Sequence, residues 1–529
     1  MRLYIFLVML GACIFSSFSQ EKTDSLYNPV NQFFAKRLFE AYQANATNLA
    51  HLPLKDFTAS SIFLNHDEGT FQDGRTPENI TEFGVHTSGL YRSKNNLLFF
   101  GNLSFKKSYY KNLKWNLSYQ LPYRGLMQDP HYFGVSKGAS WNNQNYDLNG
   151  GMLLPLNSKL NLLLETDYHL FNKYRTNLDP RAQLTSNALN FKAGLSYQVH
   201  PAHALNASFN YGYQHIDNDI NYSNREQNIP ANYDIYVKWI SGLGSTSSPF
   251  NNTTKRRSTN YQARIGHLYK TNALQIATDF NYKKTELITY RNNGVEDTDD
   301  PSEYFATYTP KTYELRSTAL LHLNTEKKML LELNAVHTTA DNFWQSKGGK
   351  TYAAATTSAK GSFHMLRSNS KNDFWDYGGD LEWWHVDQND ALAATSLEYT
   401  YLEIGGYLLR SFELSNQTAL APYIKPNLQL NLNSAYFQGN AGDLIDLAEN
   451  DFAGLTQKAL YDEVIHPNAE YYGINKAGIT LGLQSKFNQA KDYQLNWDLQ
   501  GSFYAPLEST LYFKNENRFS FSTSLTLSY

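Results

Sequence analysis

The sequence predicts a transmembrane antiparallel β-barrel of about sixteen strands, with fourteen to eighteen compatible with the pattern, preceded by a short N-terminal helical segment. Three observations predict this all-β fold class. Apolar and polar residues alternate over stretches of about 10 to 13 residues, short and long connections alternate along the chain, and aromatic residues reach 15%, with 39 Tyr and 31 Phe. The mean hydropathy of −0.53 is nonetheless polar, as expected when one face of each strand meets water.

The first nineteen residues have the layout of a signal peptide. Arg2 supplies a positive n-region, Leu3–Phe15 supplies an apolar h-region, and Ser17 and Ser19 are the small residues before a cleavage site. We therefore expect residues 1–19 to be removed and the mature chain to begin at Gln20.

The single cysteine of the chain, Cys13, lies inside this leader. A rival interpretation takes Leu10–Cys13 as a lipoprotein box, but it leaves a very short h-region and an apolar pair, Ile14–Phe15, after the lipidated residue. With the leader removed, the mature protein is expected to have no disulfide, no thiolate metal site and no thiol nucleophile.

Residues 20–57 form a predicted periplasmic N-terminal segment with a short helix. After Gln20 no run of about 18 apolar residues occurs, so we expect no membrane-spanning helix. Pro29 can open a helix, and apolar residues follow it at roughly helical spacing: Val30, Phe33, Phe34, Leu38, Ala41 and Tyr42. We expect this helix to pack against or inside the periplasmic mouth, with a gating plug as the alternative, because wide barrels often need their lumen filled.

The barrel itself is predicted over residues 58–529, and its last strand carries the strongest pattern. Ser and Thr occupy the even positions from Ser520 to Ser528, whereas the odd positions are mostly large and apolar. Such a strand suits lipid on one side and water on the other. The residues expected to serve as the assembly signal are Phe519, Phe521, Leu525, Leu527 and Tyr529.

The same alternation recurs in earlier segments, including Leu205–Tyr213, Leu274–Tyr282 and Tyr493–Phe503. A tilted membrane strand needs about 9–11 residues, whereas soluble strands average about 5–6, so the length favours the membrane.

Connection lengths give an independent test. Short joins are expected at 93–96, 155–159, 200–203, 271–272, 325–328, 415–417 and 488–492, and longer polar segments at 120–143, 172–186, 217–257, 286–310, 342–376, 438–471 and 505–517. Bacterial barrels have this layout, with short periplasmic turns and long external loops. The strand count is least certain at Thr58–Phe71 and at Asp376–Leu414, which reads either as one long strand or as a strand with an external hairpin.

If the apolar residues face lipid, the residues on the opposite face of each strand line the lumen. The charged lumen-facing candidates are Glu165, Asp167, Lys192, Asp279, Arg316, Glu332, Lys486 and Asp498. Both signs are present without an excess of one, so a strongly ion-selective ring is not predicted. An open pore and a lumen braced by ion pairs remain equally compatible with this list.

Tryptophans are concentrated in one region, which we interpret as a loop. The candidates for ligand contact are Trp344, Trp375, Trp383 and Trp384, whose rings could stack on a sugar or another flat molecule. The competing interpretation, which we favour, places them in an external aromatic girdle or in loop packing.

No catalytic residues, metal ligands or cofactors are predicted. The sequence has no Gly-rich nucleotide loop, no HExxH and no nucleophile elbow, and scattered His residues near Ser and Asp carry little weight. Asp297–Asp300 is expected to be a solvated acidic loop rather than a cation site. The net charge of −3 gives no basic face for nucleic acid.

The whole chain resembles outer-membrane β-barrel proteins of Bacteroidetes that lack an assigned activity. The resemblance depends on the leader ending Ser17–Gln20, the N-terminal helix, and the Ser/Thr-interleaved strand ending at Tyr529. It implies a place in the cell outer membrane of a Gram-negative bacterium, in contact with outer-membrane lipid and lipopolysaccharide after insertion by the barrel assembly machinery.

The resemblance further implies a porin-like channel or an accessory subunit beside a TonB-dependent transporter. Because catalytic constellations are missing, we do not expect an enzyme. A rim hydrolase and a structural barrel with a closed lumen are kept as alternatives. We find no plug domain or TonB box of the kind that such transporters carry.

Overall fold

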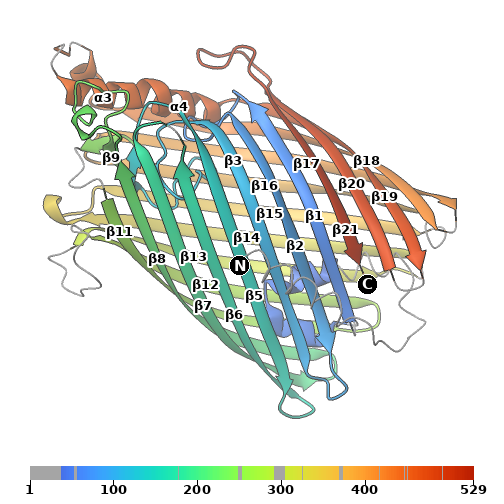
Figure 1. Ribbon diagram of the computed structural model, residues 1–529. Helices are drawn as coiled ribbons and strands as arrows, with labels where there is room; N and C mark the ends of the chain where they lie inside the picture. Colours follow the sequence, from blue (N-terminus) through green and yellow to red (C-terminus); the bar gives the residue numbers. More distant parts are fainter. Residues whose placement is uncertain are drawn as a thin grey trace.

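The computed structural model describes residues 37–52, 56–176, 178–247, 253–290, 304–324, 326–368, 373–415, 417–445, 447–448, 451–490 and 493–528. Eighteen antiparallel strands form one closed sheet (Figure 1). The predicted signal peptide lies outside the described residues.

Each strand of the barrel pairs with its neighbours along the chain. The first nine are β1 (Asp56–Gly69), β2 (Asn79–Arg92), β3 (Leu98–Leu113), β5 (Ala139–Pro155), β6 (Leu160–Arg175), β7 (Arg181–His200), β8 (His203–Asn221), β11 (Thr253–Lys270) and β12 (Leu274–Tyr290). The other nine are β13 (Tyr304–His322), β14 (Lys327–Trp344), β15 (Tyr352–Ser368), β16 (Phe374–Asp390), β17 (Thr395–Ser415), β18 (Thr418–Gln438), β19 (Lys476–Ala490), β20 (Tyr493–Pro506) and β21 (Arg518–Ser528).

The barrel closes where the last strand meets the first. β21 pairs with both β20 and β1, from Gly69 opposite Arg518 to Ala59 opposite Ser528. Among the assembly-signal residues, Phe519, Leu525 and Leu527 expose their side chains on the outer wall, and Tyr529 lies outside the described residues. The seam therefore uses the alternating strand that the sequence singled out, and the signal itself stays a prediction.

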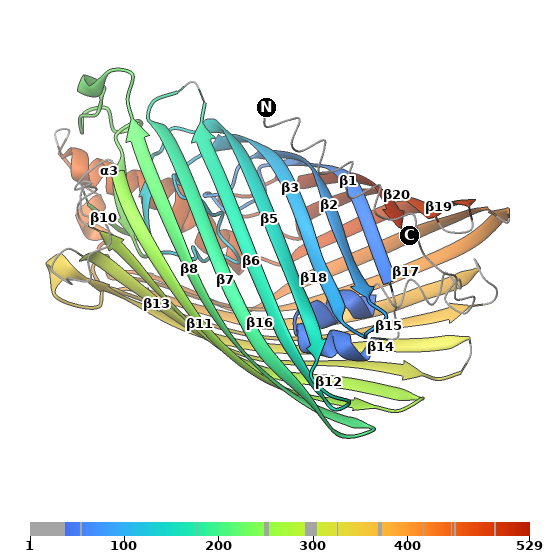
Figure 2. The ribbon, with the colours of Figure 1, turned by 60° about the horizontal axis from the view of Figure 1, so that its bottom comes forward.

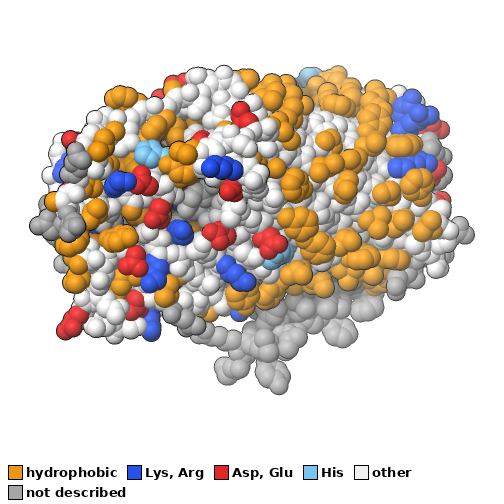
Figure 3. All heavy atoms as spheres, turned by 90° about the horizontal axis from the view of Figure 1, so that it is seen from above, with side chains coloured by type: hydrophobic (Ala, Val, Ile, Leu, Met, Phe, Trp, Pro, Cys, Tyr) orange, Lys and Arg blue, Asp and Glu red, His pale blue; other side chains and the backbone are white. Residues whose placement is uncertain are grey.

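Large apolar side chains cover the outer wall. Ile265, Leu333, Phe363 and Leu481 are examples, with 43 to 62% of their surface exposed. Figure 3 shows a broad band of hydrophobic side chains, with charged side chains gathered toward the left-hand end and along the right-hand rim. Such a band is the surface that lipid requires, so this is a transmembrane barrel.

The count of eighteen strands lies within the predicted range but exceeds the predicted sixteen. The predicted loop 342–376 contains the whole of strand β15, and the ambiguous segment 376–414 is divided between β16 and β17. Strand β15 escaped notice because Ala, Ser and Thr occupy both of its faces, so its outer side is scarcely more apolar than its inner side.

Short turns join the strands at one end of the barrel, the short-turn end; the long connections lie at the other, the long-loop end, together with the short β16–β17 turn at 391–394. In bacterial barrels these are the periplasmic and external ends. At the long-loop end a small sheet of β4 (His131–Gly134), β9 (Lys238–Ser241) and β10 (Ser245–Ser247) accompanies helices α3 (Phe452–Leu460), η6 (Tyr461–Ile465) and α4 (His466–Gly473). No helix among the described residues is long and apolar enough to cross a membrane.

Candidate functional site

A short N-terminal segment fills the lumen at the short-turn end. Residues 37–43 are helical and lead into the 3-10 helix η1 (Ala46–His51); we call residues 37–52 the N-terminal plug. Figures 1 and 2 show it in blue, inside the barrel. The sequence predicted a helix against or inside this mouth, and the structure has helical residues 37–43 inside it. Pro29 and residues 30–36 lie outside the described residues.

The wall around the plug is apolar on its inner side. The plug buries Leu38, Phe39, Tyr42, Ala46, Leu49 and Leu52. These side chains share one hydrophobic cluster with an apolar ring on the barrel strands, made of Leu90, Leu98, Phe100, Leu153, Leu163, Ala204, Leu268, Ala277, Leu320, Leu330, Leu366, Phe374, Leu409, Ala421 and Tyr423. Leu and Phe side chains inside an otherwise polar lumen are favourable only when covered, so the ring is built to hold the plug.

Polar contacts fix the plug against particular strands. Arg37 forms an ion pair with Asp376 of β16 at 3.2 Å. Asn206 of β8 donates to the Asn48 side-chain oxygen at 2.8 Å, and Asn45 donates to Asp279 of β12. Apolar contacts alone would permit the plug to slide, whereas these bonds specify one seat.

The carboxyl end of η1 meets two cations from the wall. Lys270 donates to the His51 carbonyl oxygen at 2.7 Å, and Arg92 donates to the carbonyls of Leu49 and Ala50 at 3.4 and 3.3 Å. These are the carbonyls that a helix end leaves without internal partners, and positive side chains satisfy them best. Burial, reinforced by the nearby charges of Lys270 and Arg92, lowers the pKa of His51 to about 4.

At the long-loop end, loops and helices fold inward into the barrel. The outer cap, as we call residues 114–135, 237–247 and 452–473, packs against the inner faces of β12 to β17. Its buried residues include Trp115, Tyr132, Ile240 and Tyr461, each about 1% exposed. If these loops lay above the rim without packing into the barrel, their side chains would be exposed to water. The cap is therefore a folded part of the barrel interior.

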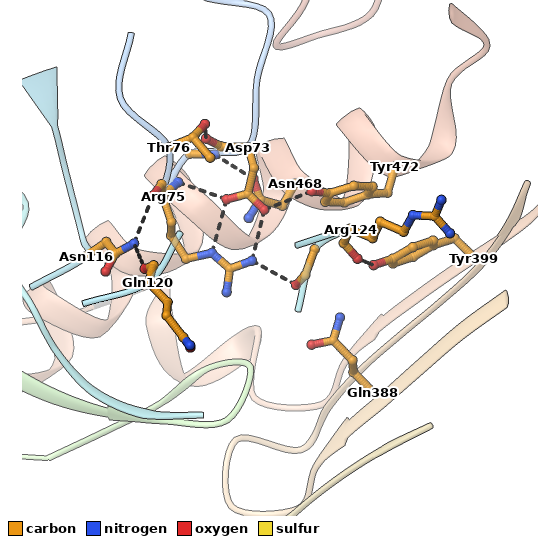
Figure 4. A network of polar contacts seen from close by, with 12 residues as sticks. Asp73, Arg75, Thr76, Asn116, Gln120, Arg124, Gln388, Tyr399, Asn468 and Tyr472 are labelled. Atoms are coloured by element: carbon orange, nitrogen blue, oxygen red, sulfur yellow. Dashed lines mark hydrogen bonds and ion pairs between the residues drawn. The ribbon is translucent and has the colours of Figure 1, made fainter. Parts of the chain in front are cut away.

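A buried ion pair organises the cap (Figure 4). Arg75 donates to both carboxylate oxygens of Asp73, at 3.1 and 2.9 Å, and to the Gly125 carbonyl at 2.9 Å. Tyr472 of α4 donates to Asp73 at 3.1 Å. Burial on its own would raise the pKa of Asp73, but the adjacent Arg75 guanidinium holds the pKa below its usual value. The pair therefore links loop 70–78, the hairpin around Gly125 and helix α4.

A second buried cluster contains a histidine beside a serine. Ser241 and His131 Nδ1 lie 3.0 Å apart, and Asn342 lies 3.1 Å from His131 Nε2. Asp129 binds Arg256 and the backbone amide of His131, not its ring, so no Ser–His–Asp relay is formed. Burial and Arg256 lower the pKa of His131 to about 3. Ser241 is 1% exposed, which is the arrangement of a packed core rather than of a reachable nucleophile.

Between the plug and the cap the lumen holds solvent-exposed charge. A cavity of about 340 Å³ lies beside the plug, lined by Gln43 and Ala44 and by Asp147, Glu165, Asp167 and His169 of the wall, among others. Asp147 and His169 keep 43 and 51% of their side chains exposed although they face inward. This middle part of the lumen, the chamber, is therefore accessible to water.

Strand alternation places all eight predicted lumen residues on the inner face. Lys192 pairs with Glu165 at 2.9 Å, Asn149 donates to Asp167, and Asp279 lies opposite Arg316. Asp498 accepts from Tyr423 at 3.0 Å and from Gln484 at 2.7 Å. Lys486 lies 5.3 Å from the ring centre of Phe374, and Glu332 lies opposite Thr318. Most of these charges have a partner, so they brace the wall as well as line the chamber.

The four tryptophans do not share a loop, contrary to the sequence interpretation. Trp344 ends β14, whereas Trp375, Trp383 and Trp384 all belong to β16. Trp344 and Trp384 are buried inside, 4 and 6% exposed, while Trp375 and Trp383 face outward, 37 and 36% exposed. The prediction was wrong because strand β15 lies within the segment 342–376, which had been predicted as one long loop. The outward pair lies on the lipid-facing wall, with Trp375 near the short-turn end and Trp383 near the middle of β16, so neither residue marks an external girdle.

The described part of the chain contains no cluster of metal-ligating side chains. No group of three or more His, Cys, Asp or Glu side chains could hold a metal ion there. Asp297–Asp300 lies outside the described residues. The organising residues of the cap, Asp73, Arg75 and Arg124, were not singled out from the sequence, because only the long-range fold brings them together.

A closed barrel with an apolar outer wall, a polar lumen and both mouths filled defines the class of this protein as an outer-membrane β-barrel. Residues 46–529 match the model of DUF6850, a family of unknown function, and the chain belongs to that family. No curated protein matches the chain.

Solved barrels resemble it at low identity. The siderophore receptor PiuA from Acinetobacter baumannii matches with 8% identity and a TM-score of 0.36, over 90% of this chain and 82% of the receptor. OccAB3 from Acinetobacter baumannii matches with 9% identity and a TM-score of 0.35, over 90% of this chain and 99% of OccAB3. The monoaromatic hydrocarbon channel CymD matches with 7% identity and a TM-score of 0.30, over 92% of each chain. At such identities and TM-scores these likenesses carry no functional argument.

Proposed function

We propose that this protein is a gated outer-membrane channel for polar solutes, held closed in the present conformation by the N-terminal plug. The observation that carries the proposal is the water-accessible chamber between plug and cap, lined by charged and amide side chains. A purely structural barrel has no need for a hydrated interior sealed by a separate segment. The apolar ring supports a plug that can leave and return, because its contacts are mainly non-directional.

A cross-link across the plug tests this proposal. Asn48→Cys with Asn206→Cys joins the plug to β8 at side chains that now share a hydrogen bond, and Cys13 is the chain's only native cysteine. The full chain should show discrete openings in planar bilayers, and a short bismaleimide should abolish them in the double variant. Each single-cysteine variant treated in the same way is the matched control and should keep its openings.

The second candidate is an accessory subunit of a larger transport complex, for example beside a TonB-dependent transporter. Filled mouths at both ends favour it, because a subunit that supports a neighbour needs no path of its own. It predicts negligible conductance, with or without the cross-link, and co-purification with another outer-membrane protein after gentle extraction. Conductance that the plug cross-link controls would exclude it.

We further propose that the chain is exported with cleavage before Gln20, inserted by the barrel assembly machinery, and surrounded by phospholipid and lipopolysaccharide. The leader pattern and the β21 alternation support this. N-terminal sequencing of protein extracted from bacterial outer membranes tests it. A mature N-terminus at Cys13 would instead support the lipoprotein interpretation.

A further inference from the structure

A hairpin of the cap reaches deep into the barrel. Tyr123 and Leu126 exchange backbone hydrogen bonds of 2.9 and 3.0 Å around a two-residue turn. Both turn residues have left-handed backbone, with φ of 50° at Arg124 and 75° at Gly125, which is the geometry of the tightest hairpin turns. We call residues 123–126 the hairpin tip.

The hairpin tip is clamped by backbone contacts on two sides. Arg75 donates to the Gly125 carbonyl at 2.9 Å, and Tyr399 of β17 donates to the Arg124 carbonyl at 2.7 Å. A Cβ atom at Gly125 would lie 2.3 Å from the Tyr399 hydroxyl, so only glycine fits there. The tip is thus held as a fixed structure, and its side chains have defined positions (Figure 4).

Arg124 points its side chain at an acidic part of the wall. Its guanidinium lies 2.5 Å from Glu382 Oε1 and 3.8 Å from the ring centre of Trp384, both on β16. Glu382 lies opposite Glu403 of β17 in the strand register, on the same lumenal face. Two carboxylates placed opposite each other repel, so this wall requires a cation.

Lys360 of β15 supplies a second positive charge. It lies 3.7 Å from Glu382 and 4.0 Å from Asp380, and its side chain is 47% exposed. Arg124 covers Glu382 until only 11% of that side chain is exposed. The wall therefore carries three carboxylates, Asp380, Glu382 and Glu403, against two cations, one of which comes from the tip. Tyr123, beside it, is 66% exposed.

We propose that the hairpin tip is the charge-selecting constriction of the channel, and that Arg124 sets its ion preference by neutralising Glu382. Glu382 lies near the middle of β16, so the tip meets the wall at mid-depth in the lumen. Permeating ions there meet a nearly balanced field, because Arg124 offsets one carboxylate. This inference rests on the proposed channel function and adds the residues that choose the solute's charge.

Reversal potentials across a KCl gradient measure this preference in the full-length protein. Arg124→Gln should raise the cation-to-anion permeability ratio by about twofold or more, since one carboxylate at the constriction loses its counter-charge. Glu382→Gln should lower the ratio, because the guanidinium is then unpaired. The double variant, Arg124→Gln with Glu382→Gln, should return close to the wild-type ratio.

Arg181→Gln is the matched control, because it removes the same charge from a side chain that is 57% exposed on β7, away from the tip. Its permeability ratio should stay unchanged. The heat-induced mobility shift of a folded barrel verifies that each variant is folded. Conductance with equal ratios in wild type and Arg124→Gln would overturn this inference while leaving the channel intact. No conductance in any variant would overturn both the channel and this inference.

Discussion

Asp73 and Arg75 are the residues on which the outer cap depends most. Both are buried, with side chains 3 and 5% exposed, and Arg75 also holds the hairpin tip through Gly125. A buried pair contributes little beyond what an apolar pair would, but a single buried charge without its partner is very unfavourable.

Asp73→Asn should therefore destabilise the cap by about 3–5 kcal/mol, because Arg75 stays buried without a counter-charge. Limited proteolysis of the folded protein in detergent should show new cleavage in residues 114–135. The matched control is Asp462→Asn, which breaks the Lys458–Asp462 pair, whose side chains are 44 and 46% exposed. An exposed pair of this kind contributes about 0–1 kcal/mol. Equal protease resistance in Asp73→Asn and wild type would contradict the assigned role.

At the scale of elements, the N-terminal plug combines an apolar seat with a titratable end. His51 has its pKa lowered from 6.5 to about 4 in the docked plug, first by burial and then by Lys270 and Arg92. In a released plug this pKa returns toward 6.5. The released state therefore binds the proton more readily, and docking weakens as the pH falls from about 6.5 toward 4. Above that window the docked plug keeps its full stability.

Open probability in planar bilayers should accordingly rise between about pH 7 and pH 5. His51→Gln cannot titrate, so its open probability should change far less over the same range. A pH response of equal size in His51→Gln would assign the effect to other groups.

Which elements the sequence could reveal depended on the contrast between the two faces of a strand. β21 alternates large apolar residues with Ser, so its lipid face was plain, and the same parity placed Glu165, Asp279 and Asp498 in the lumen. β15 has Ala, Gly and Thr where other strands have Leu or Phe, so it was read as loop. Arg75 and Arg124 carry no local pattern, because Gly125 and Glu382, which they contact, are distant from them in sequence.

At the scale of the whole molecule, the two faces of the barrel wall differ in whether they accept a charged side chain. The outer face meets lipid, whereas the inner face meets water. Leu333 on β14 is 61% exposed on the outer wall, and the next residue, Asn334, points into the lumen. Leu333→Arg should cost about 2–4 kcal/mol on folding into lipid vesicles, because it places a charge among acyl chains. Val336→Arg introduces the same residue three positions along, on the lumenal face opposite Glu314 and Ser358, and should fold almost as wild type does. Equal folding yields for the two variants, read from the heat-induced mobility shift, would contradict the assigned orientation.

The plug ends at residue 52, and the strand that closes the seam, β1, begins at Asp56. Four peptide steps reach about 14 Å at full extension, so a plug that leaves its binding site stays tethered close to it. Its local concentration at the mouth is consequently in the millimolar range or above, and recapture is fast. Such a tether predicts brief, flickering current bursts rather than one lasting open level. It also keeps the resting channel closed without a further locking contact.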